Sequence, residues 1–108
     1  MNLQLRYGPV SVGEIEGAFW SDDTGYGVFR PTSPASDGPT ERRVREYIVF
    51  SEDWHRRLRA EAEYSASEWD AFRDVYDSGL WHTVAPDGAV SRIGGPVFVD
   101  GEVTWRPD

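Results

Sequence analysis

The stretch from Ser51 to Gly79 constrains the fold most, because it is the longest part of the chain with helical periodicity. Once Ser65 is counted as a polar member, its apolar side chains recur every three or four residues: Trp54, Leu58, Ala62, Trp69, Phe72 and Tyr76. The pattern keeps its phase through the middle of the stretch. It therefore predicts one long helix, or two nearly coaxial helices, rather than two helices packed against each other.

Capping signals mark the expected ends of this helix. Ser51 is a good N-cap, and Gly79 suits the position just after the last helical residue. Ser65 and Glu68 also have the spacing of a capping box, which would start a second helix. We therefore expect a kink near residues 65–67.

Strand patterns precede the predicted helix. Alternating apolar residues predict a short strand over residues 3–7, and segments 15–20 and 26–30 flank a polar loop typical of a hairpin. In this hairpin the glutamates alternate with Ile15, Gly17 and Phe19, so one face is expected to meet water. Residues 44–50 are the most β-prone run of the chain and are assigned to a central strand.

Two more hairpins are expected after the helix. Segments 80–85 and 89–93 surround a Pro-Asp-Gly turn, and segments 97–99 and 102–105 surround an Asp-Gly turn. The turn types set the register, which predicts these cross-strand pairs: Val84 with Val90, His82 with Arg92, Trp81 with Ile93, and Phe98 with Val103. Trp105 then lies on the core side.

The expected fold class is α+β, with an antiparallel sheet of five to seven strands packed on one long helix. The order is β-β-β-β-α-β-β-β-β. The 108 residues are expected to form a single domain with one core. Residues 31–40, which hold three Pro and one Gly, are expected to form an exposed Pro-rich loop within it.

Composition weakens several classes of function. The chain has no Cys, its two His lack metal-ligand spacing, and it contains no phosphate-binding glycine motif, so we predict no metal and no cofactor. A net charge of −8 argues against nucleic-acid binding. No segment is apolar for the length of a membrane span, and no leader is evident, so a cytoplasmic protein is expected. The exclusive use of Arg as the basic residue is typical of a high-GC bacterial genome.

Charge is unevenly distributed along the chain. Residues 42–59 hold six Arg against three acids, whereas residues 60–108 hold three Arg against ten acids. On a single helix the side chains of Glu63, Asp70, Asp74 and Asp77 would project within roughly 60° of one another, away from the apolar stripe. The helix dipole favours basic residues near the C-terminal end of a helix, where Asp70, Asp74 and Asp77 are expected. Local helix stability therefore does not explain these acids.

The five Trp residues are numerous for this length. Most of them fall at positions of the helix and strand patterns that face the core, but the placement of Trp20 and Trp81 is less determined. Trp20 adjoins the acidic hairpin loop, and Trp81 precedes His82 in a predicted strand. Because interfaces favour Trp, these two residues join the four acids as candidate partner-binding residues.

Three functional hypotheses remain open. The first is a non-enzymatic binding domain, such as a bacterial immunity or antitoxin-like inhibitor, that uses its carboxylates to bind a basic protein partner. The second is a small enzyme or ligand-binding domain with a pocket between sheet and helix near His82, Trp81 and Tyr47. The third is a self-associating accessory domain. The sequence leans against enzymatic activity without deciding the question.

Overall fold

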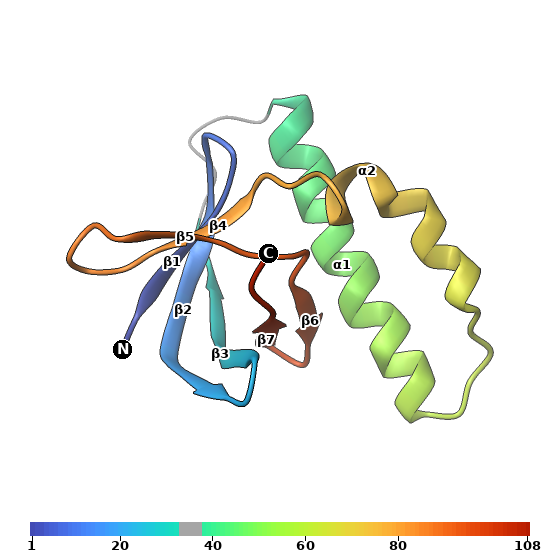
Figure 1. Cartoon of the computed structure of the whole chain (residues 1–108). Coiled ribbons are helices and arrows are strands. Elements are labelled where there is room, and N and C mark those ends of the chain that lie inside the picture. Colours follow the sequence, from blue (N-terminus) through green and yellow to red (C-terminus); the bar gives the residue numbers. More distant parts are fainter. Residues whose placement is uncertain (33–37) are drawn as a thin grey trace.

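The chain has an α+β fold in a computed structural model that describes residues 1–32 and 38–108. Seven antiparallel strands form one sheet in the order β5-β4-β1-β2-β3-β7-β6, which confirms the predicted class and strand number. The strands are β1 (Leu3–Tyr7), β2 (Val10–Ser21), β3 (Thr24–Pro31), β4 (Trp81–Val84), β5 (Val90–Arg92), β6 (Val97–Val99) and β7 (Glu102–Trp105). The helical segments lie together on one side of the sheet (Figure 1).

The long helix lies earlier in the chain than predicted. Helix α1 (Pro39–Arg59) includes the whole of residues 44–50, so the predicted central strand there is wrong. The run also has helical spacing, since Val44, Tyr47 and Ser51 are buried on one side of α1. A Pro at the first helical position starts the helix, and packing of this face outweighs the β propensity of the run. Ser51 is therefore a buried mid-helix residue and not an N-cap.

The predicted continuous helix from Ser51 to Gly79 is also wrong. The chain leaves α1 after Arg59, and Glu61 takes a left-handed backbone conformation with φ of 54°. It then returns along α1 as a 3₁₀ helix, η1 (Ala66–Phe72), followed by the short α2 (Arg73–Tyr76) (Figure 1). The two halves of the apolar stripe meet in part: the Trp54 and Trp69 ring centroids are 5.6 Å apart, whereas Leu58 and Tyr76 remain 37% and 39% exposed.

Sequence signals occur at both ends of residues 65–79, which we call the returning segment. The Ser65 side chain accepts the Ser67 N–H, and the Glu68 carboxylate accepts the Ser65 N–H, so the predicted capping box starts η1. Gly79 has φ of 74°, which suits a glycine, but α2 ends at Tyr76 with Asp77 as its C-cap, so the predicted end of the helix lies two residues too late. The capping box marks a chain reversal followed by a new helix, however, and not a kink in one helix.

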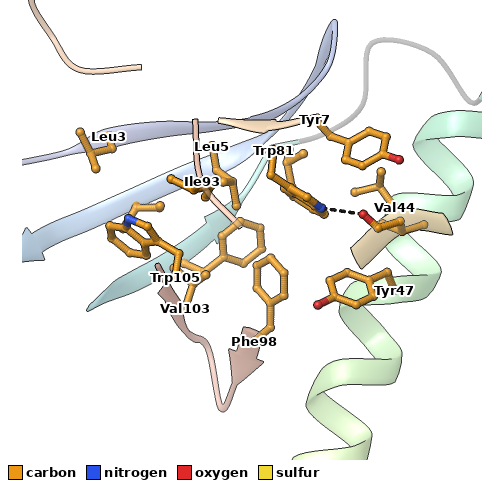
Figure 2. Packing of buried hydrophobic residues seen from close by; sticks show 14 residues of the cluster. Leu3, Leu5, Tyr7, Val44, Tyr47, Trp81, Ile93, Phe98, Val103 and Trp105 are labelled. Atoms are coloured by element: carbon orange, nitrogen blue, oxygen red, sulfur yellow. Dashed lines mark hydrogen bonds between the residues drawn. The ribbon is translucent and has the colours of Figure 1, made fainter. Parts of the chain in front are cut away.

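The core lies between the helices and the inner face of the sheet (Figure 2). Tyr47 of α1 is fully buried among Trp81, Phe98 and the rings of the returning segment, and its hydroxyl donates to the Pro96 carbonyl at 2.6 Å. Burial raises the pKa of this hydroxyl, since the charged form would lose its water. Trp105 is also buried, as predicted.

The strand registers follow the turn chemistry. Val84 pairs with Val90, His82 pairs with Arg92, and Phe98 pairs with Val103, all as predicted. Near the C-terminus the Gly94 N–H donates to the Arg106 carbonyl at 2.9 Å, which links the segment after β5 to the segment after β7. The Ile93–Pro107 bridge lies at the same place, so the chain after β5, at one edge of the sheet, meets the chain after β7, near the other edge.

The predicted loop over residues 31–40 is only partly described. Pro31 belongs to β3, and Pro39 is the first residue of α1, so the connection is shorter than expected. Its central part, residues 33–37, lies outside the described residues.

Candidate functional site

The four acids expected on one helical face are distributed over several elements. Glu63 lies in the turn after α1, Asp70 in η1, Asp74 in α2, and Asp77 just after α2. Each of the four side chains is exposed. They do not share one helical face, because they do not belong to one helix. The prediction that these four acids lie on one helical face is wrong, because α1 ends at Arg59 and the chain reverses its direction before η1 begins.

Arginines neutralise three of these four acids. The Arg43 guanidinium donates to both Asp74 carboxylate oxygens, at 2.8 and 3.0 Å, and stacks over the Phe72 ring at 4.4 Å. Hydrogen bonding from Arg43 lowers the pKa of Asp74. Arg73 lies 3.0 Å from Asp70 and 3.8 Å from Asp77. Asp74 therefore links α2 to α1 through a partly exposed ion pair, and the local charge is less negative than the sequence suggested.

The two candidate tryptophans differ completely in their surroundings. Trp81 is only 1% exposed, and its Nε1 donates to the Val75 carbonyl at 3.0 Å (Figure 2). The expectation that Trp81 could be an exposed anchor is therefore wrong. Trp20 is 53% exposed at the tip of the β2–β3 hairpin, where its ring meets the buried Trp105 edge to face at 5.7 Å. Among the predicted aromatic anchors, only Trp20 is available to a partner.

The region proposed for a ligand pocket near His82, Trp81 and Tyr47 is filled. Trp81 and Tyr47 pack against each other in the core with ring centroids 6.0 Å apart. His82 is the next residue along β4 and so points to the other face of the sheet, where it pairs with Arg92. These three residues do not surround a common cavity.

A surface that the sequence analysis missed lies on the uncovered side of the sheet. Phe19 of β2 and Tyr26 of β3 are cross-strand partners, and their rings stack at 5.3 Å with an interplanar angle of 17°. Val28 follows two residues after Tyr26 and so lies on the same face. Phe19 is 57% exposed and Val28 is 40% exposed. We call these three residues the outer aromatic patch.

A β-bulge explains why this patch was not predicted. Strict alternation along β2 would have placed Phe19 with Ile15 on the buried face. The register between β2 and β3 shifts between Glu16 and Phe19, and Gly17 in this interval has φ of 61°. The extra residue moves Phe19 to the same face as Glu16. Gly17 was the available signal, because glycine within a strand is typical of a bulge.

Two glutamates border the outer aromatic patch. Val28 pairs with Glu16 of β2 on one side and with Glu102 of β7 on the other, so both carboxylates lie beside it. Arg30 forms an ion pair with Glu16 at 3.2 Å. Among the residues that the structure describes, none forms an ion pair with Glu102. This surface therefore combines exposed aromatic rings with negative charge that is only partly neutralised.

Within residues 1–32 and 38–108, no group of three or more His, Asp or Glu side chains could hold a metal ion. None of the described helices is long and apolar enough to cross a membrane.

Comparisons of the chain with protein-family models, with curated proteins and with solved structures gave no match.

Proposed function

We propose that this chain is a non-enzymatic domain that binds a basic protein partner through the uncovered face of its sheet. The observation that carries the proposal is the outer aromatic patch of Phe19, Tyr26 and Val28, exposed between Glu16 and Glu102. Exposed aromatic residues are enriched at protein interfaces, and a surrounding rim of charge selects the partner. An immunity or antitoxin-like inhibitor of a cationic bacterial protein is the most specific form of this proposal.

Charge complementarity supports a basic partner. The chain carries a net charge of −8, and the exposed turn between β2 and β3 adds Asp22 and Asp23 near the patch. Such a field speeds the encounter with a cationic protein and is screened by salt. The same field disfavours a second copy of this chain on this face, because two copies would bring like charges together.

The proposal is tested with two valine substitutions that introduce the same positive charge. Val28→Arg places a cation between Glu16 and Glu102, and is expected to weaken binding to the purified native partner by about tenfold or more. Val49→Arg, on the exposed side of α1 where Val49 is 68% exposed, is the matched control and is expected to leave the affinity nearly unchanged. Equal losses in both variants would contradict the proposed surface.

A second comparison separates the sheet surface from the helical acids. The double variant Asp70→Asn with Asp77→Asn removes two exposed charges but leaves the Arg43–Asp74 contact intact. We expect only a small decrease in the association rate, because the partner does not contact these residues. A large increase in the dissociation rate would instead assign the interface to the helical acids.

A further inference from the structure

The outer aromatic patch contains a hollow that has the properties of a receptor for one cationic side chain. It has a volume of about 220 Å³ and is lined by the outer aromatic patch together with Glu16, Gly17, Gly27, Glu102 and Val103. Pockets for small-molecule ligands commonly have volumes of about 300–1,000 Å³, so this hollow is better matched to a single side chain. Its walls come from three neighbouring strands, β2, β3 and β7.

The charges and rings that line the hollow favour a guanidinium group. Glu16 and Glu102 lie on opposite sides of Val28, in the two neighbouring strands. Phe19 and Tyr26 add aromatic surface. A guanidinium can donate to carboxylates through several N–H groups while its plane rests on an aromatic ring, whereas an ammonium acts as a compact point charge.

The chain itself shows that a guanidinium reaches part of this site. Arg30 of β3 lies 3.2 Å from the Glu16 carboxylate; the Arg30 side chain is largely exposed and that of Glu16 is partly exposed. An incoming guanidinium would therefore share Glu16 with Arg30 and would find Glu102 without an ion-pair partner among the described residues. Arg30 thus competes with the occupant and is expected to lower its affinity.

We infer that the hollow between Phe19, Tyr26, Glu16 and Glu102 binds an arginine side chain of the basic partner. This inference rests on the proposed function and adds to it the identity of the side chain recognised. It also predicts opposite effects for two substitutions that both alter charge at the same surface. Removing the charge of Glu102 weakens binding, whereas removing that of Arg30 strengthens it.

The probe is N-acetyl-L-arginine amide, and its neutral analogue N-acetyl-L-citrulline amide is the comparison. Binding is followed by NMR through the Phe19 and Tyr26 ring signals and the Val28 methyl signals. We expect saturable shifts with the arginine compound and much smaller shifts with citrulline. Glu102→Gln should weaken arginine binding about fivefold, and Arg30→Gln should strengthen it about twofold, as expected for partly exposed ionic contacts.

Glu14→Gln is the matched control, because Glu14 is exposed on the same face, pairs with Arg30 across the strands and lies outside the hollow. It should change arginine binding little. Equal shifts with arginine and citrulline would overturn the inference, and so would equal losses in Glu14→Gln and Glu102→Gln. The native partner separates the inference from the proposed function. If Glu102→Gln binds the partner with normal affinity while Val28→Arg binds it more weakly, the arginine-binding hollow is refuted but the proposed function still holds.

Discussion

Ser51 and Phe98 are joined by two hydrogen bonds that connect the middle of α1 to the last strand of the sheet. The Ser51 hydroxyl accepts the Phe98 N–H at 2.9 Å and donates to the Phe98 carbonyl at 3.1 Å. Both residues are fully buried. Because β6 has only β7 as a neighbouring strand, Ser51 takes the place of a further strand at this position.

Ser51→Ala is therefore expected to destabilise the fold strongly for so small a change. It leaves the buried N–H and carbonyl of Phe98 without partners, which should lower the free energy of unfolding by about 2–3 kcal/mol. Urea denaturation compares this variant with Ser91→Ala, whose serine lies exposed in β5. Similar stability of the two variants would show that the Ser51–Phe98 pair contributes little.

The close contact between Gly25 and Trp105 makes a second stability prediction. A Cβ atom at position 25 would lie 2.3 Å from Cε2 of the Trp105 indole, so Gly25→Ala should cost about 2–3 kcal/mol or shift the buried ring. Gly94→Ala is the control, since the nearest atom to its added Cβ would be 3.8 Å away. Thermal unfolding and near-ultraviolet circular dichroism measure both effects. A stable Gly25→Ala protein with an unchanged tryptophan spectrum would disprove this packing.

The Arg43–Asp74 pair makes a prediction about pH. Hydrogen bonding from Arg43 lowers the pKa of Asp74 in the folded protein, so the pair stabilises the fold above the unfolded-state pKa of about 3.9. This contribution is lost as the pH falls through the folded-state pKa. Asp74→Asn should thus lower stability by about 0.5 kcal/mol at neutral pH, with a difference from wild type that shrinks below about pH 4.

Asp22→Asn is the control for the pH experiment. Asp22 lies exposed in the β2–β3 turn with φ of 57°, a conformation that Asn also tolerates. Urea denaturation of the three proteins at several pH values gives the comparison. A stability difference between wild type and Asp74→Asn that stays constant from neutral to acidic pH would contradict a stabilising ionic contact.

The fold class and the hairpin registers could be predicted because short-range chemistry determines them. Turn residues such as Asp100-Gly101 set the strand pairing directly, and alternation in β1 identifies its buried face. The helix boundaries could not be predicted in the same way. Residues 44–50 fit both a strand and one side of a helix, and only their packing against β6 and the returning segment decides between the two.

The candidate site was harder to predict than the fold, for two physical reasons. The acids at 70, 74 and 77 were judged from their own segment, whereas the charges that neutralise Asp74 come from Arg43, far away in sequence. The outer aromatic patch depends on one additional residue at the Gly17 bulge, which changes the face of Phe19. Ion pairs between distant residues and β-bulges of this kind cannot be predicted from the periodicity of apolar residues in the sequence.

The central claim is that the outer aromatic patch contacts the partner, and cross-saturation NMR on the complex tests it most directly. With the partner irradiated, saturation should reach the Val28 methyls and the Phe19 ring, while the Val49 methyls on α1 keep their full intensity. Saturation at Val49 or along residues 66–77, with Val28 and Phe19 unaffected, would contradict the claim.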